Sequence, residues 1–204
     1  MRRTLIVAIS FVFLMGFLIS GCTTHNAAMS FNQEAPAPDS AAPDRLNAIV
    51  VYDSWSGNTR QIAEEIADVL NCPAIPVDAA GECVMADYDL IVVGSPVHGG
   101  MPTAKINDFL SGLESVRASA VFVTYGAPLF GTLTANKCLN SMEKKLGGHC
   151  VGRYKCNGFH KILRTYPSHP DETDKSEAAR FAAGLLERIT PHETTAETIP
   201  ETIH

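Results

Sequence analysis

Short apolar runs alternate with amphipathic stretches along most of this chain. The apolar runs are rich in β-branched residues, and they predict strands at 49–51, near 74–77, up to Gly94, at 120–125 and at 150–156. Apolar residues recur at helical spacing in the stretches between and after them, within 59–70, 106–113, 133–146 and 176–189. This alternation predicts one α/β domain with a parallel sheet, because strands joined by helices lie parallel.

The turn after the first strand is rich in small polar residues. Ser54, Ser56, Asn58 and Thr59 surround Gly57, and Asn58 or Thr59 is the expected N-cap of the helix that follows. Backbone N–H groups, small hydroxyls and the positive end of a helix together form a phosphate site. The turn holds no lysine or arginine, so a phosphate loop of the G-x-x-x-x-G-K-[ST] type is absent, as is the dinucleotide fingerprint G-x-G-x-x-G. The alternative is a capped turn without a ligand.

A second loop follows the strand that is predicted to end at Gly94, and it is rich in glycine and proline. Glycines let the backbone approach a flat ligand closely, and prolines stiffen the loop. A third loop, 126–132, follows the next strand, and all of these loops lie at the carboxyl edge of the sheet, where open α/β sheets bind ligands. The irregular connection 157–171 is long enough to suggest a function or mobility.

The motif Ser54-x-Ser56-Gly57-Asn58-Thr59 resembles the phosphate loop of flavodoxins. The stretch Gly94-Ser95-Pro96-Val97-His98-Gly99 resembles the loop of flavodoxin-like proteins that lies along the isoalloxazine of FMN. The resemblance covers about residues 45–190. It implies a doubly wound, five-stranded parallel sheet of order 2-1-3-4-5, with helices on both faces, and one non-covalently bound FMN.

The same resemblance implies roles for individual residues. The phosphate would be held by Ser54, Ser56, Asn58 and Thr59, with help from the backbone amides of Trp55 and Gly57. The ring would be lined by Pro96, Val97, His98, Gly99 and Gly100. Relatives often place two aromatic residues at the positions of His98 and Gly99, so Phe130 and Tyr125 are candidates for stacking, with a core position favoured for Tyr125 because it lies at a strand end. His98 is either a spacer beside the ring or a proton donor to flavin or substrate, and no residue is assigned a catalytic role.

The start of the chain resembles a bacterial lipoprotein signal. Arg2 and Arg3 precede an apolar run that ends at Ser20-Gly21-Cys22, a sequence similar to a lipobox. The resemblance implies a signal peptide at 1–21, a lipid on Cys22 that anchors the protein outside the cytoplasm to a bacterial-type membrane, and a disordered tether at 22–44. Residues 191–204 are expected to form a loose polar tail. The alternatives are an ordinary signal peptide or an uncleaved anchor, and the two arginines are either a twin-arginine signal or an ordinary basic start.

Charge and cysteine content narrow the range of partners. The chain has 22 acidic and 16 basic residues and a net charge of −6, which argues against nucleic acid as a partner. Five cysteines remain after Cys22, so at least one thiol stays free, and Cys150 and Cys156 cannot pair if they share a straight strand. No C-x-x-C and no histidine cluster at zinc spacing occurs, which argues against a metal site.

Three functions are compatible with these features of the sequence. The favoured one is a membrane-tethered FMN electron carrier that passes electrons to a redox partner protein or a quinone, with the protein binding and tuning the flavin. The second is an FMN-dependent NAD(P)H:quinone-type oxidoreductase, which needs an open face beside the ring. The third is a binding module that keeps the fold without the flavin.

Overall fold

Five parallel strands form one sheet in the order β2-β1-β3-β4-β5. The protein is represented by a computed structural model, which describes residues 46–113 and 116–189. The strands are β1 (Ala48–Tyr52), β2 (Ala74–Pro76), β3 (Leu90–Pro96), β4 (Ala118–Tyr125) and β5 (Cys150–Asn157). The strand order 2-1-3-4-5 and the doubly wound fold implied by the flavodoxin resemblance are therefore confirmed.

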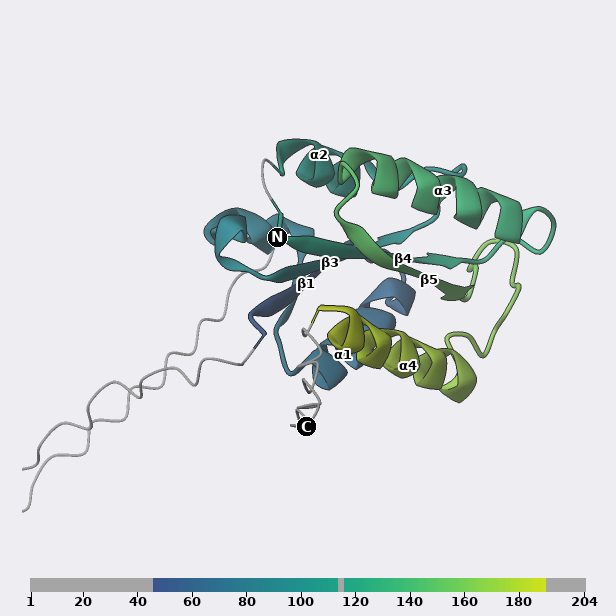
Figure 1. The fold of residues 1–204 in the computed structure, drawn as a ribbon. Coiled ribbons are helices and arrows are strands. Elements are labelled where there is room, and N and C mark those ends of the chain that lie inside the picture. The colour runs from purple at the N-terminus through teal and green to yellow at the C-terminus, as the bar shows by residue number, and fades with distance from the viewer. Residues whose placement is uncertain (1–45, 114–115, 190–204) are drawn as a thin grey trace, which may run out of the picture. The chain divides into compact units, whose positions relative to one another are not determined.

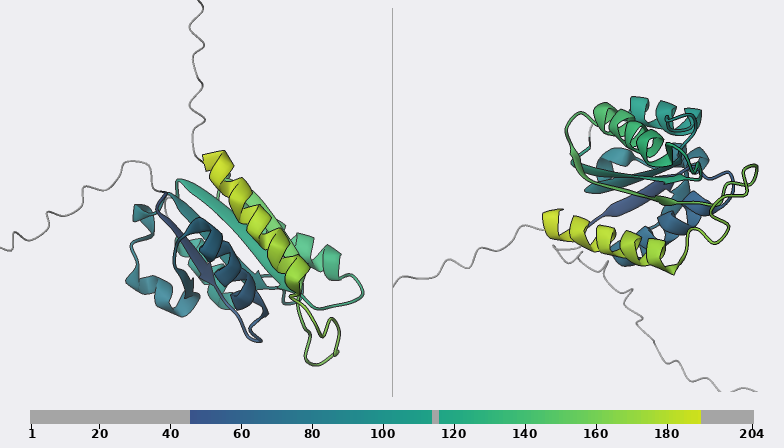
Figure 2. Two further views of the ribbon diagram at one scale, coloured as in Figure 1. Left: turned by 90° about the horizontal axis from the view of Figure 1, so that it is seen from below. Right: turned by 90° about the vertical axis from the view of Figure 1, so that its right-hand side faces the viewer.

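Helices cover both faces of the sheet (Figures 1 and 2). One face carries α1 (Asn58–Leu70) and α4 (Glu172–Ile189). The other face carries α2 (Ala104–Gly112), α3 (Gly131–Lys145) and the short 3-10 helices η1 (Val77–Glu82) and η2 (Met85–Asp87). All five residues of β1 are buried, with Val50 facing α1 and Ile49 facing α2 and α3. Successive side chains of a strand point to opposite faces, so the central strands are apolar throughout.

The predicted end of the third strand at Gly94 is wrong, because β3 continues to Pro96. Gly94 pairs with Phe122 of β4, and the fully buried ring of Phe122 lies across the glycine. A Cβ on Gly94 would lie 2.5 Å from Cε1 and 2.7 Å from Cε2 of that ring. The glycine therefore lies inside the strand, where it makes room for an aromatic side chain in the core.

The last helix starts four residues before the predicted start at Ser176. Asp171 Oδ1 accepts hydrogen bonds from the backbone N–H groups of Thr173 and Asp174, and Asp174 Oδ2 accepts one from the N–H of Asp171. This reciprocal capping begins the helix before its apolar face does. The hydrogen bond from the N–H of Asp174 is the main reason that the pKa of the Asp171 carboxyl is below its usual value.

The same cap accounts for a cluster of potential metal ligands. His169, Asp171 and Asp174 bring ligand atoms to within 4.8 Å of one another. His169 Nδ1 lies 2.5 Å from Asp174 Oδ2, so these groups already bond to each other and to the start of α4. The cluster is explained as a helix cap, and we assign it no metal.

All five cysteines of the described part of the chain are free thiols: Cys72, Cys83, Cys138, Cys150 and Cys156. Burial raises the pKa of Cys72 to about 11 and that of Cys138 to about 12, so both remain protonated and unreactive at neutral pH. The signal peptide, Cys22, the tether at 22–44 and the tail at 191–204 lie outside the described residues. Within 46–113 and 116–189, no helix is long and apolar enough to cross a membrane.

Candidate functional site

The turn between β1 and α1 ends in a glycine that caps the helix. Gly57 has φ 90°, a left-handed conformation that glycine adopts without strain, and its carbonyl accepts the N–H of Gln61. The prediction that Asn58 or Thr59 is the N-cap is therefore wrong. Both residues lie inside the first turn of the helix, and their side chains bond to other parts of the fold.

Two residues of the motif tie this turn to distant segments. Asn58 Nδ2 donates to the carbonyl oxygen of Phe159 at 3.0 Å. Thr59 is 1% exposed, and its hydroxyl shares a hydrogen bond of 3.0 Å with the hydroxyl of Thr124, at the end of β4. These contacts hold the turn in place from two sides. The predicted role of both side chains as direct phosphate ligands stays a prediction.

The start of α1 presents unused hydrogen-bond donors. Among the described residues, none accepts a bond from the backbone N–H groups of Gly57, Asn58 or Thr59. The next N–H group of the helix, that of Arg60, donates to the hydroxyl of Ser54 at 3.2 Å. Free N–H groups at the positive end of a 13-residue helix form a site for an anion.

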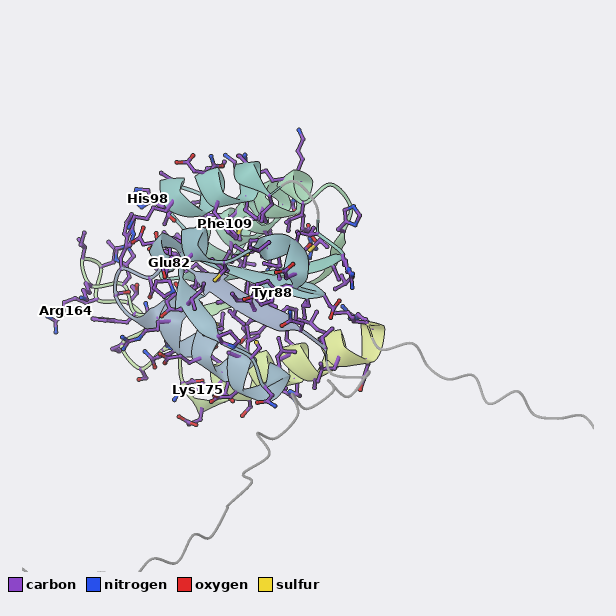
Figure 3. The ribbon with its side chains drawn as sticks, turned by 90° about the vertical axis from the view of Figure 1, so that its left-hand side faces the viewer. Glu82, Tyr88, His98, Phe109, Arg164 and Lys175 are labelled. Atoms are coloured by element: carbon purple, nitrogen blue, oxygen red, sulfur yellow. The ribbon has the colours of Figure 1, made fainter. Side chains whose placement is uncertain are left out.

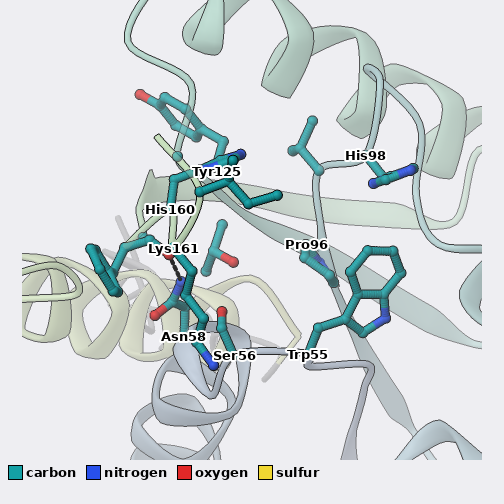
Figure 4. Close-up of a pocket in the computed structure, with 14 residues that line it drawn as sticks. Trp55, Ser56, Asn58, Pro96, His98, Tyr125, His160 and Lys161 are labelled. Atoms are coloured by element: carbon teal, nitrogen blue, oxygen red, sulfur yellow. Dashed lines mark hydrogen bonds between the residues drawn. The ribbon is translucent and has the colours of Figure 1, made fainter. Parts of the chain in front are cut away.

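A cavity of about 360 Å³ lies beside these donors at the carboxyl edge of the sheet (Figure 4). Predicted site residues from both loops line it, namely Trp55, Ser56, Asn58, Pro96, Val97 and His98. The rings of Trp55 and His98 meet edge to face, with centroids 5.0 Å apart and an angle of 60° between their planes. Trp55 lines this cavity and is 64% exposed, so most of its side chain faces solvent.

Other predicted ring contacts lie outside this lining. Gly99 and Gly100 have φ values of 58° and 81° and form a tight turn in which His98 and Met101 exchange backbone hydrogen bonds of 2.9 and 3.0 Å. A turn with two such residues requires glycine or asparagine, which explains the sequence without a ligand. Phe130 caps the start of α3 and is 74% exposed. The predicted contacts of these three residues with a flavin ring remain predictions.

The cavity is also lined by Thr124 and Tyr125 at the end of β4 and by Gly126, which follows the strand. Five residues of the loop after β5 complete the lining, and no motif indicated them: Gly158, Phe159, His160, Lys161 and Ile162. A Cβ on Gly126 would lie 2.6 Å from His160 Cβ, and one on Gly158 would lie 2.7 Å from Asn58 Nδ2. The loop after β5 therefore packs closely against the site. The unusual length of 157–171 was the signal for this contribution.

A second cavity, of about 600 Å³, lies on the other side of the same turn. Its lining shares Trp55, Ser56 and Lys161 with the first cavity and adds charged groups of both signs from Asp53, Arg60, Asp78 and Lys105. Lys105 and Asp78 form an ion pair of 2.5 Å. One carboxylate oxygen of Asp53 is buried and has no partner among the described residues. The turn at 54–57 thus separates a mainly apolar cavity from a charged one.

Comparison with known proteins decides the family. The family model described as flavodoxin domain matches residues 49–166, more than half of the chain. The chain belongs to the flavodoxin-domain family. An uncharacterized protein of Methanocaldococcus jannaschii is 29% identical to this flavodoxin-domain chain over 149 residues, which cover 69% of the chain and 99% of the relative.

Two solved flavodoxin structures share the fold of this flavodoxin-domain protein. A flavodoxin from the domain Archaea has a TM-score of 0.52 and 22% identity, and the match covers 71% of this chain and 99% of the other. Oxidised flavodoxin 2 from Bacillus cereus has a TM-score of 0.53 and 22% identity, with 70% and 99% covered. At these identities the likeness shows the fold alone.

The residues of this flavodoxin-domain protein fit a flat ligand that carries a phosphate. The free N–H groups of Gly57–Thr59 suit the anion, and the adjoining cavity is walled by Pro96, Val97 and aromatic side chains. Asn157 Oδ1, at the end of β5, is buried without a hydrogen-bond partner among the described residues, but Asn157 lines neither cavity.

Proposed function

We propose that this flavodoxin-domain protein binds one FMN non-covalently and carries electrons. The observation that supports this proposal is the row of unused N–H groups at the start of α1, directly beside the mainly apolar cavity at the carboxyl edge of the sheet. FMN, when bound, supplies transfer of one or two electrons. The protein holds, orients and shields the cofactor.

The proposal gives each side of the site a separate task. The N–H groups of Gly57–Thr59 and the hydroxyl of Ser56 bind the phosphate, and Ser54 orders the first turn by accepting the N–H of Arg60. Pro96 and Val97 pack along the ring, and Trp55 covers one edge of it. The edge-to-face contact with Trp55 supports the spacer role of His98 over the role of a proton donor.

Reconstitution of the purified protein tests this function. We expect the apoprotein to take up one equivalent of FMN, with quenched flavin fluorescence and a higher unfolding temperature, because a ligand that binds only the folded state stabilises it. During stepwise reduction we expect a one-electron-reduced state to accumulate, as suits a carrier. A protein that takes up no flavin would instead be a binding module on the same fold.

The second cavity supports an enzyme as the alternative function. Its lysine and arginine side chains could hold a second, phosphorylated substrate beside the flavin, as an NAD(P)H:quinone-type oxidoreductase requires. Rapid oxidation of NADH or NADPH by the FMN-loaded protein, with a quinone as acceptor, would favour this alternative over the carrier.

The proposal also includes a lipid anchor on Cys22 that holds the domain at a bacterial-type membrane outside the cytoplasm. The support is the lipobox-like sequence that ends at Cys22, followed by a proline-rich stretch. In a bacterial host we expect the full chain to sediment with membranes and Cys22→Ser to lose this association. Cys83→Ser, which removes a thiol within the folded domain, should stay with the membranes. Unchanged membrane association of Cys22→Ser would refute the anchor.

A further inference from the structure

Hydrogen bonds hold the loop after β5 against the turn at 54–59, here called the phosphate turn, and against the end of β4. Gly158 donates its N–H to Tyr125 O at 2.9 Å, and Phe159 O accepts from Asn58 Nδ2. His160 and Thr165 pair through their backbones, and the Thr165 hydroxyl donates to Gly126 O. Residues 161–164 form the tip between them. The position of this tip over the site is therefore set by hydrogen bonds at its base.

Lys161 extends from this tip toward the phosphate turn. In the view of Figure 4 its side chain runs from the loop toward Asn58 and Ser56, with which it lines the first cavity. Lys161 is the one residue of the loop that lines both cavities. It forms no ion pair within the described part of the chain, whereas Lys105 and Lys175 are paired with Asp78 and Glu172. Its charge is free to meet an anion.

We propose that Lys161 supplies the positive charge of the phosphate site, so that the protein selects a phosphorylated flavin over riboflavin by charge as well as by hydrogen bonding. This inference rests on the proposed FMN function. The turn at 54–59 offers only neutral donors, the next residue, Arg60, is paired with Glu64 at 3.6 Å, and the protein carries a net charge of −6. A lysine brought over the turn from a remote loop forms a charge-assisted hydrogen bond with a phosphate oxygen, which is about twice as strong as a neutral one. It also offsets the unfavourable field of the acidic protein.

Flavin titrations of the full-length apoprotein test the role of Lys161. The variants are Lys161→Met, which keeps the length of the side chain without the charge, and Lys161→Arg, which keeps the charge. We expect Lys161→Met to raise the Kd for FMN about tenfold and to leave the Kd for riboflavin within about twofold. We expect Lys161→Arg to stay within about threefold of the wild type for FMN, because guanidinium also binds phosphate.

Arg164→Gln is the matched control. Arg164 lies on the same tip and carries the same charge, but it lines neither cavity and points outward into solvent (Figure 3). We expect it to leave both Kd values within about twofold. Raising the salt from about 0.01 M to about 1 M shortens the Debye length from about 30 Å to about 3 Å, and it should weaken FMN binding more in the wild type than in Lys161→Met.

The outcomes separate this inference from the function on which it rests. A wild type that binds neither flavin overturns the proposed function and the role of Lys161 together. If the wild type binds FMN but Lys161→Met leaves the ratio of the FMN and riboflavin Kd values unchanged, the role of Lys161 alone is overturned. An equal loss of FMN affinity in Arg164→Gln would also overturn the role of Lys161, because the summed positive charge of the loop would then explain the effect.

Discussion

Ser56→Asp is expected to weaken FMN binding by at least about a hundredfold. Ser56 is exposed, lines both cavities and lies next to the free N–H groups of the helix start. Two unit charges 4 Å apart repel by about 4 kcal/mol at an effective dielectric constant of about 20. Solvent lowers this value at an exposed position, but the double charge of the phosphate raises it, so about 3 kcal/mol is a fair expectation. Fluorescence titration of the apoprotein measures the Kd.

Two controls isolate the charge as the cause. Ser56→Asn has nearly the same shape as the aspartate variant without its charge, and we expect it to bind FMN within about threefold of the wild type. Riboflavin lacks the phosphate, so Ser56→Asp should bind it as the wild type does. Both variants should unfold within about 0.5 kcal/mol of the wild type, because the position is exposed. Tight FMN binding by Ser56→Asp would place the phosphate elsewhere.

Gly94→Ala should destabilise the domain by about 3 kcal/mol. The added methyl group would overlap the ring of Phe122, which is fully buried between β4 and the layer of α1 and α4. Overpacking of this kind costs about 1–3 kcal/mol, and the upper end applies because neither the ring nor the paired strands have room to move. Chemical denaturation of the apoprotein measures the change in the free energy of unfolding.

Gly184→Ala provides the contrasting substitution. Gly184 lies inside α4, and a Cβ there meets nothing within 4 Å. Alanine loses less conformational freedom than glycine when a helix forms, so we expect about 0.5–1 kcal/mol of added stability. If Gly94→Ala were as harmless as Gly184→Ala, the packing of Phe122 across β3 would be contradicted.

Local patterns were sufficient to predict the strands, the helices and the two motif loops of the candidate site. The apolar runs and the helical spacing placed the elements to within a few residues, because both patterns report which side chains must leave water. The flavodoxin-like motifs supplied the strand order and the two loops at the carboxyl edge. Trp55, Ser56, Asn58, Pro96, Val97 and His98 line one cavity, and their contacts with a flavin stay a prediction.

Contacts between distant segments were beyond the reach of local patterns. Asn58 and Thr59 look like helix caps in the sequence, but they bond to Phe159 and Thr124, which are 101 and 65 positions away along the chain. Gly94 opens the glycine- and proline-rich motif in the sequence, but in the structure it lies in β3 beneath the ring of Phe122.

The sequence by itself therefore determined the α/β architecture and the two motif loops of this protein. Only the tertiary structure decided that the loop after β5 packs against the turn at 54–59 and that Lys161 lines both cavities beside that turn. The physical reason is that buried apolar residues recur along the sequence with the period of the helix or strand that they form. The position of a polar loop depends instead on single hydrogen bonds and close approaches, such as those at Gly126 and Gly158. Such contacts produce no periodic pattern in the sequence.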